Sequence, residues 1–130
     1  MPDPFQLCHQ PLIAFVATRD AERAKKFYRD TLGLTLVSDE TPFALVFDAH
    51  GTMLRVTPVK ELAPAVYTVL GWQVPDIYAA AKALQKAGVQ FERYDGVPQD
   101  ELGVWTAPGG AARVAWFKDP DGNTLGISQH

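Results

Sequence analysis

The 130-residue sequence has a single cysteine, Cys8, no apolar run long enough to cross a bilayer, and no excess of positive charge. One cysteine excludes an intramolecular disulfide framework and a cysteine-rich zinc site. The longest apolar run near the start, residues 12–17, is far shorter than the ~20 residues that a membrane helix needs. The net charge of −3 argues against a nucleic-acid surface, which carries a basic patch. We therefore expect a cytoplasmic protein that has neither a membrane nor a nucleic acid as its partner.

Apolar residues make up 47% of the chain and charged residues 21%. This composition excludes a disordered chain, because enough apolar surface is present to form a hydrophobic core. The length fits one compact domain that spans residues 1–130.

The chain contains a weak internal repeat, since each half begins with an apolar strand, an aspartate and a helix that ends at a glycine. The aspartate and glycine are Asp20 and Gly33 in the first half, and Asp76 and Gly88 in the second. An aspartate side chain accepts hydrogen bonds from the free N–H groups at a helix start. Glycine readily adopts the left-handed conformation that ends a helix. The repeat therefore predicts two helices at equivalent places.

Strands are expected before and after each predicted helix. They are expected at 12–18, 34–39, 43–48, 52–58, 67–74, 89–94, 112–118 and 123–128. Turn-forming residues at 49–52 and 119–123 (Asp-Pro-Asp-Gly-Asn) predict tight hairpins, whereas residues 99–110 are expected to form an irregular loop. The pattern is βαβββ twice, an α+β architecture. The chain divides into module one (about 10–58), a linker (59–66) and module two (about 67–128).

Two segments, DAERAKKFYRDTLGL (20–34) and VAWFKDPDGNTLGIS (114–128), resemble the vicinal oxygen chelate superfamily. That group contains glyoxalase I, extradiol dioxygenases, fosfomycin-resistance transferases and bleomycin-resistance binding proteins. The resemblance covers residues 10–128. It implies that the two βαβββ modules form a cup-shaped mixed sheet with one helix packed on each module, and it implies a homodimer.

Metal-dependent members of this family hold a divalent ion through side chains on the first and last strands of each module. The resemblance places Ile13, Arg55, Val69 and Gly126 at these positions. Isoleucine, valine and glycine side chains offer no lone pair to a metal, and the arginine charge repels a cation. We therefore expect no metal and no cofactor.

Side chains alternate between the two faces of a strand, so the same alignment predicts which residues line the cup. The expected ligand-binding residues are Ile13, Phe15, Met53, Arg55, Val69, Gln73, Trp105 and Gly126. Most of these residues are apolar, as in typical small-molecule pockets. Arg55 can hold an anionic ligand, unless a carboxylate such as Asp48 or Glu92 pairs with it.

The leading hypothesis is a metal-free relative that binds a small aromatic or anionic organic molecule in its cup, by analogy with the bleomycin-resistance branch. The alternative is a divergent metal-dependent lyase or dioxygenase, which a stoichiometric divalent ion would identify. A third hypothesis is a dimeric scaffold whose cup is filled by its own side chains and therefore has no cavity.

Overall fold

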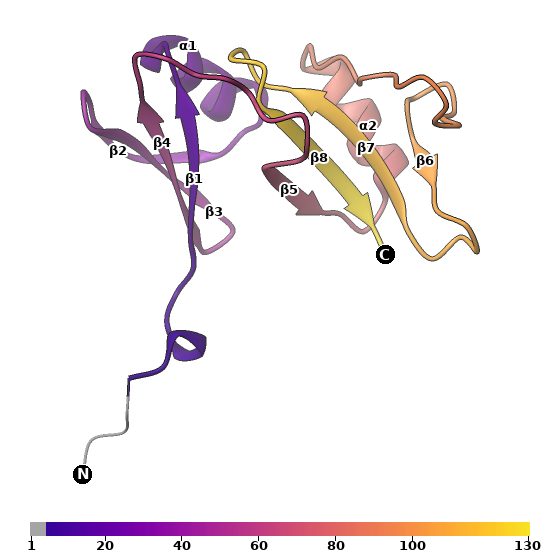
Figure 1. Cartoon of the computed structure of the whole chain (residues 1–130), viewed down its shortest axis with the longest axis horizontal. Coiled ribbons are helices and arrows are strands. Elements are labelled where there is room, and N and C mark those ends of the chain that lie inside the picture. The colour runs from indigo at the N-terminus through magenta and orange to yellow at the C-terminus, as the bar shows by residue number, and fades with distance from the viewer. Residues whose placement is uncertain (1–4) are drawn as a thin grey trace.

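The computed structural model describes residues 5–130, which form two four-stranded sheets with a helix on each (Figure 1). The first module contains β1 (Ile13–Thr18), α1 (Ala21–Lys26), β2 (Thr35–Glu40), β3 (Ala44–Ala49) and β4 (Thr52–Pro58). The second module contains β5 (Leu70–Gln73), α2 (Ile77–Lys86), β6 (Trp105–Thr106), β7 (Arg113–Lys118) and β8 (Thr124–Gln129). The predicted α+β class and the double βαβββ order are confirmed. Residues 1–4, which the expected domain includes, lie outside the described residues.

The two sheets have equivalent strand orders, β1-β4-β3-β2 and β5-β8-β7-β6. In each sheet the first and last strands of the module are parallel neighbours, and the other pairs are antiparallel. In Figure 1 the helix α2 lies behind β7 and β8. The internal repeat in the sequence therefore corresponds to a repeat in topology.

Both helices begin and end where the sequence predicts. Asp20 Oδ1 accepts a hydrogen bond from the Arg23 N–H at 3.1 Å, and Asp76 Oδ1 accepts from the second and third helical residues at 3.1 and 3.2 Å. Gly33 and Gly88 follow the helices with φ of 76° and 103°, which glycine adopts without strain. The first helix differs in one respect, because α1 continues as a five-residue π-helical turn, η2 (Phe27–Thr31).

The turn between β7 and β8 has the tight form that its Asp-Pro-Asp-Gly-Asn sequence predicts. The Gly122 N–H donates to the Asp119 carbonyl at 3.0 Å, and Gly122 has a φ of 88°. Asp119 Oδ1 also accepts hydrogen bonds from the N–H groups of Asp121 and Asn123, each at 2.9 Å. These side-chain bonds replace the ladder bonds that the reversing chain cannot form.

The prediction of a strand at 89–94 is wrong, because the structure has no strand there. Toward β7, this segment makes a single bridge, between Phe91 and Phe117, and one backbone hydrogen bond, from the Glu92 N–H to the Trp116 carbonyl. The amide of Gln99 explains the difference, because it donates to the Glu92 carbonyl and accepts from the Tyr94 N–H. Backbone groups that a strand would use are thus satisfied by a side chain from the following loop.

The outer strand of the second sheet is instead β6, inside the segment 99–110 that the sequence predicts to be an irregular loop. Trp105 and Thr106 pair antiparallel with Val114 and Arg113. The rest of the segment 99–110 is irregular, as expected, and these two residues give the second module its fourth strand.

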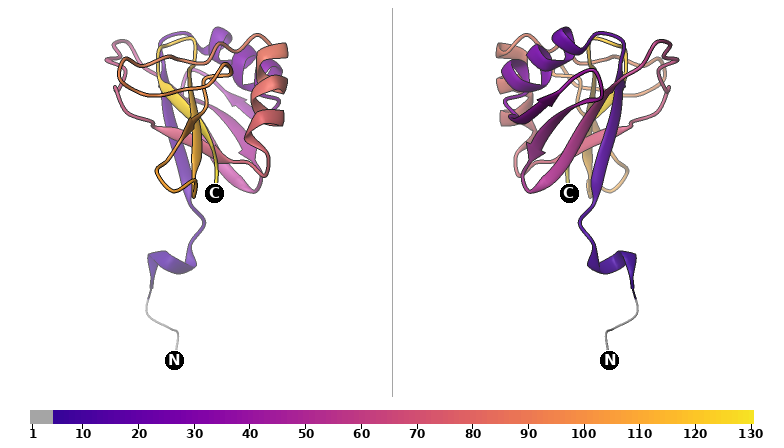
Figure 2. Two further views of the ribbon diagram at one scale, coloured as in Figure 1. Left: turned by 90° about the vertical axis from the view of Figure 1, so that its right-hand side faces the viewer. Right: turned by 90° about the vertical axis from the view of Figure 1, so that its left-hand side faces the viewer.

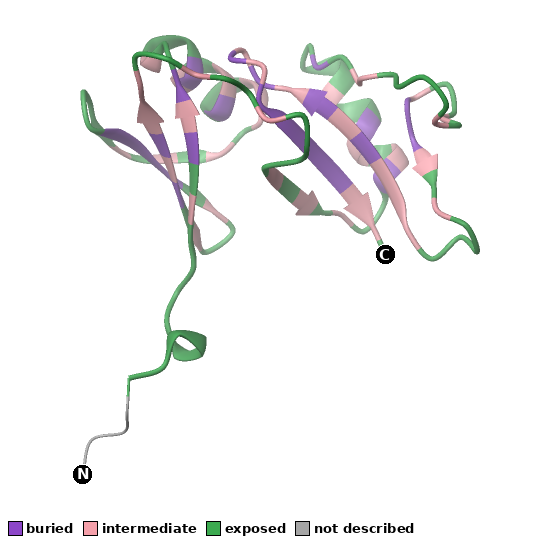
Figure 3. Cartoon of the chain, viewed as in Figure 1, coloured by how far each residue is buried: buried purple, intermediate pink, exposed green. Residues whose placement is uncertain are grey.

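The hydrophobic core lies between the helices and the sheets, and both modules contribute to it (Figure 3). In the first module, Tyr28 packs 6.0 Å from Phe47, measured between ring centroids. In the second, Ile77 and Phe117 are fully buried. In residues 5–130 no helix is long and apolar enough to cross a membrane.

Buried polar side chains join the modules near the turn between β7 and β8. Tyr28 Oη donates to Asp119 Oδ2 at 2.7 Å, and Thr18 Oγ1 donates to Asp121. Arg23 adds an ion pair with Asp121 at 3.2 Å. We call these five residues the module clasp. It fixes the second module against the ends of β1 and α1.

Residues 5–12 precede β1 and extend away from the rest of the chain (Figure 2). They include one turn of 3-10 helix, η1 (Leu7–His9). Phe5, Leu7 and Leu12 each have about three quarters of their surface exposed. This segment contributes no residue to the hydrophobic core.

Candidate ligand-binding cup

The face of each sheet that points away from the helices is here called the cup face. In the first module, β1 and β4 are parallel neighbours, with Ile13 beside Met53 and Phe15 beside Arg55. Ile13, Phe15 and Met53 are 43%, 62% and 40% exposed, whereas Val16, Leu54 and Val56, which alternate with them, are buried. The four predicted residues on these strands therefore share one open face.

Arg55 is half-buried on this face. Its Nη2 lies 3.6 Å from Glu40 Oε1, which is an ion-pair distance but too long for a good hydrogen bond. A carboxylate thus pairs with Arg55, as the sequence left open, but it is Glu40 and neither of the two named candidates. Asp48 accepts from the Gly51 N–H in the hairpin turn instead, and Glu92 lies in the second module. Within residues 5–130 the Arg55 guanidinium donates no hydrogen bond, so its donors are available to a ligand.

On the cup face of the second module, two glycines are neighbours. Gly71 on β5 lies beside Gly126 on β8, and Trp116 on β7 lies on the other side of Gly126. A Cβ on Gly71 would lie 3.3 Å from the Gly126 carbonyl oxygen, so even alanine is tight there. We call the two glycines the glycine floor. Gly71 is exposed, whereas Gly126 is buried, and a Cβ on Gly126 would lie 3.5 Å from the Thr68 methyl and 3.6 Å from the Trp116 indole.

Three aromatic side chains stand together beside the glycine floor. The Trp105 and Trp116 rings are tilted by 37° with centroids 6.2 Å apart, and Tyr94 meets Trp116 edge-on at 5.6 Å. We call Tyr94, Trp105 and Trp116 the aromatic wall. Burial, and then the negative charge of Glu92, raise the pKa of Tyr94.

Sequence reasoning identified Trp105 but missed Tyr94. The segment that holds Tyr94 was expected to be a strand, and its position depends on the Gln99 side chain. Trp116 is not among the residues that the sequence predicts to line the cup. Its alternation with the buried Ala115 and Phe117 in β7 is the signal that places it on the cup face.

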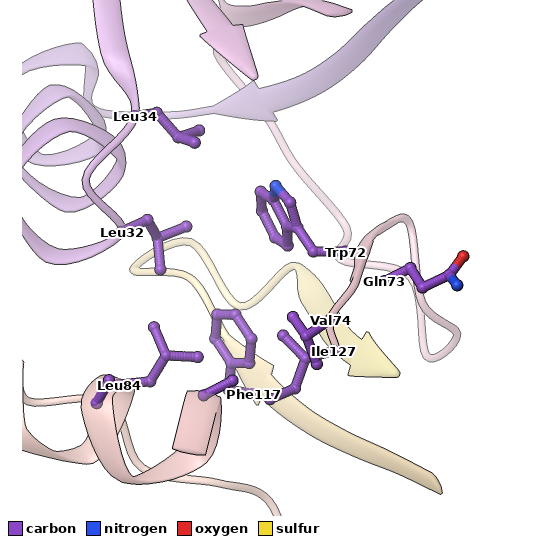
Figure 4. A pocket seen from close by; sticks show the side chains of 10 residues that line it. Leu32, Leu34, Trp72, Gln73, Val74, Leu84, Phe117 and Ile127 are labelled. Carbon is purple, nitrogen blue, oxygen red and sulfur yellow. The ribbon is translucent and has the colours of Figure 1, made fainter. Parts of the chain in front are cut away.

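The other predicted residues of the second module lie on or near the same face. Val69 is 37% exposed, and its N–H donates to the Thr124 carbonyl at 2.9 Å, which extends the register of β5 by one residue. Gln73 is exposed at the end of β5 and also borders a pocket between the modules, but its side chain points away from that pocket (Figure 4).

Lys118 adds a positive charge to the second cup face. It lies on the same face of β7 as Trp116, and its Nζ donates to Thr124 Oγ1 at 2.6 Å. Arg55 and Lys118 therefore give each module one cation on its cup face. Such groups can bind an anion, whereas the glycine floor and aromatic wall can bind an aromatic ring.

The residues at the family's metal positions do not fit a metal. Ile13, Val69 and Gly126 have no donor atom in their side chains, and Arg55 carries a positive charge at the fourth position. Across residues 5–130, no three side chains from His, Cys, Asp and Glu gather closely enough to hold a metal ion. A metal-free cup stays a prediction that measurement must test.

Known proteins provide an independent comparison. The sequence model of the Glyoxalase/Bleomycin resistance protein/Dioxygenase superfamily matches residues 10–127. Among curated proteins, none matches this chain significantly.

Solved structures with the same fold are numerous. A putative glyoxalase family protein from Bacillus anthracis has a TM-score of 0.71 at 17% identity, with 100% of this chain and 99% of that chain covered. A superfamily member from Sphaerobacter thermophilus DSM 20745 has a TM-score of 0.71 at 26% identity, with coverage of 93% and 97%. TnmS3, an antibiotic binding protein from Streptomyces sp. CB03234, has a TM-score of 0.69 at 26% identity, with coverage of 96% and 98%.

Proposed function

Because the chain belongs to the Glyoxalase/Bleomycin resistance protein/Dioxygenase superfamily, we propose that it binds a small planar aromatic anion in its cup, without a metal. The observation that carries this proposal is the aromatic wall beside the glycine floor. A planar ring can lie on a surface only where no side chain projects from it. The exposed Gly71 leaves such a surface on β5, and the side chains of Thr68 and Trp116 border it at the buried Gly126.

The preference for an aromatic ligand follows from the physics of ring contacts. Offset or edge-to-face aromatic pairs contribute ~0.5–1.5 kcal/mol beyond the burial of their surface. Trp105 and Trp116 are already tilted against each other and are half-buried, so little rotamer freedom is lost when a ligand ring packs on them.

The preference for an anion rests on Arg55 and Lys118. The Arg55 guanidinium has one distant partner, Glu40 at 3.6 Å, and can bind a carboxylate through two parallel N–H groups. An antibiotic binding protein of the same fold, TnmS3, also supports binding as the function of this chain.

We further propose that a second copy of the chain completes the cup. The two sheets of one chain share no ladder in residues 5–130, and Ile13, Phe15 and Met53 remain open to solvent on the first cup face. A homodimer that brings the first cup face of one copy to the second cup face of the other covers these side chains. It also brings Arg55 to the aromatic wall of the partner.

Light scattering on the purified protein tests the dimer. Phe15→Asp places a charge on the first cup face and should give a monomer. Val66→Asp changes a 94% exposed residue of the linker and should leave the dimer intact. A monomeric wild-type protein would contradict this part of the proposal.

The alternative hypothesis of a metal-dependent lyase or dioxygenase requires donor atoms that the four family positions lack. Elemental analysis after dialysis distinguishes the two functions, since metal-free binding predicts well under one equivalent of zinc, nickel, iron or manganese. One equivalent that disappears on mutation of a cup residue would favour the alternative.

Thermal-shift measurements with 2-naphthoate and cyclohexanecarboxylate test the ligand class. The planar acid should raise the melting temperature of the wild type, and the aliphatic acid should not. Trp116→Leu should remove the shift. Equal shifts with both acids, or the same naphthoate shift in Trp116→Leu, would contradict aromatic binding at the wall.

A cytoplasmic location completes the proposal. Cys8 is a free and exposed thiol. Such a thiol remains reduced in the cytoplasm, and the chain has no second cysteine for an internal disulfide.

A further inference from the structure

A pocket of about 340 Å³ lies between the two modules, on the side of β5 and β8 opposite the cup face (Figure 4). Leu32 and Leu34, from the connection between η2 and β2, form one wall. Leu84 on α2, Trp72 on β5 and the core strands β7 and β8 form the others. Figure 4 shows the Trp72 indole extending from β5 toward Leu32 and Leu34. The pocket is thus separate from the aromatic wall and the glycine floor.

We propose that this inter-module pocket is a second ligand site, which takes a small uncharged apolar molecule with a hydrogen-bond acceptor. No charged residue lines it, and Gln73, its one lining residue with a polar side-chain amide, points away. A charged ligand would lose its hydration without gaining a partner. The proposal goes beyond the cup function and stands or fails separately from it.

The volume of the pocket sets the size of the ligand. An apolar cavity of about 150 Å³ lined by Leu, Ile and Phe is known to bind benzene. The inter-module pocket has roughly twice that volume and a similar lining, so it fits a molecule of two fused rings.

The Trp72 indole N–H gives the pocket its polar specificity. Within residues 5–130 this N–H donates no hydrogen bond to the protein. The indole lines the pocket and is half-buried, and its nitrogen is not among the fully buried atoms that have no partner, so it is accessible to solvent or to a ligand. Buried or half-buried indole N–H groups usually have an acceptor. A ketone, ester or ether oxygen on the ligand can supply one.

The module clasp explains why the pocket stays open. Its two sides belong to different modules, so the pocket closes only if one module moves toward the other. The buried bonds from Tyr28 to Asp119 and from Thr18 to Asp121 hold the modules in their present positions. A ligand therefore meets a pocket that is formed before binding, which reduces the ordering cost of association.

Binding of 2-acetylnaphthalene to the full chain, followed by tryptophan fluorescence, tests this inference. The matched variants are Ala83→Phe and Ala79→Phe, both at exposed positions of α2, of which only the first lines the pocket. Ala83→Phe should weaken binding by about tenfold or more because its ring occupies the pocket, and Ala79→Phe should not. Trp72→Phe should reduce the fluorescence change and weaken the ketone more than naphthalene.

The cup provides an internal control. Arg55→Met should leave the affinity for 2-acetylnaphthalene unchanged, and Ala83→Phe should leave 2-naphthoate binding unchanged. Equal affinity of wild type and Ala83→Phe for 2-acetylnaphthalene, or no binding by the wild type, would overturn the inference. Conversion of a dimer to a monomer by Ala83→Phe alone would also overturn it, because the pocket would then belong to a protein interface.

Discussion

The hydroxyl of Tyr28 in the first module donates a 2.7 Å hydrogen bond to Asp119 Oδ2 in the second. The Tyr28 side chain is fully buried, and Asp119 is 5% exposed. Burial, and then the negative charge of Asp119, raise the pKa of Tyr28 well above its usual value. The hydroxyl therefore remains protonated and remains a donor, and one bond joins residues that are 91 positions apart.

Tyr28→Phe should lower the free energy of unfolding by ~1–3 kcal/mol, because Asp119 loses a buried partner while the ring packing is retained. The pKa of Tyr28 is higher in the folded protein than the value of about 10 in the unfolded chain. The stability that depends on the protonated hydroxyl is therefore fully present below pH 10 and is lost as the pH rises further. Wild-type melting temperatures should thus fall above pH 10 more steeply than those of Tyr28→Phe. Tyr67→Phe, at a residue that is 70% exposed, is the control and should behave like wild type.

Gly122→Val should destabilise the fold without a specific effect on ligand binding. Gly122 has a φ of 88°, and a Cβ there would also meet Pro64 at 3.3 Å. A β-branched residue in this conformation is strained by ~1–3 kcal/mol, so the melting temperature should fall by several degrees. Gly122→Asn is the matched control, since asparagine tolerates positive φ better and should lower the melting temperature less. An unchanged melting temperature for Gly122→Val would show that the turn differs from the one described.

Arg55→Met should weaken binding of an anionic aromatic ligand roughly tenfold to hundredfold, because a charge-assisted hydrogen bond contributes ~1.5–3 kcal/mol. A neutral analogue such as 2-naphthalenemethanol should lose much less. The measurement is the affinity for 2-naphthoate and for the alcohol, with Arg19→Met as the exposed control away from the cup face. If Arg55→Met weakened the binding of the acid and of the alcohol equally, Arg55 would not be the residue that binds the anion.

Asp39→Asn should lower the melting temperature slightly at pH 7, and the difference from wild type should shrink in acid. The Lys25 ammonium, 2.7 Å away, and the Thr41 hydroxyl lower the pKa of Asp39 from 3.8 to about 2. A lowered pKa contributes stability that is present above pH 3.8 and is lost as the pH falls toward about 2. Melting curves at pH 7 and pH 2.5 test this, with the exposed Asp95→Asn as control. A difference that grows in acid would contradict the assigned role of Lys25.

Much of the fold is predictable because its signals are local. A cap such as Asp20 bonds to an N–H three residues away, and the Asp119–Asn123 turn is held by its own side chains. Alternation likewise places Phe15 and Arg55 on the open face of neighbouring strands. Each of these signals lies within a few residues of the feature that it determines.

The remaining features depend on contacts between segments that the sequence does not align. Residues 89–94 lose their strand because the Gln99 amide satisfies their backbone groups. Arg55 pairs with Glu40 rather than with Asp48, because the pairing of β2 with β3 brings the Glu40 carboxylate toward Arg55 across the sheet. The module clasp and the pocket beside it arise only when the two modules are packed together.

Side chains alternate between the core and the cup face along β1, β4, β5 and β8. Selection for stability and selection for ligand binding therefore act on neighbouring residues. Val16, Leu54 and Ile127 point into the core, and changes there act on folding. Phe15 and Arg55 point outward and contribute little to it. A new ligand preference can therefore evolve through substitutions at every second position, while the intervening positions preserve the scaffold.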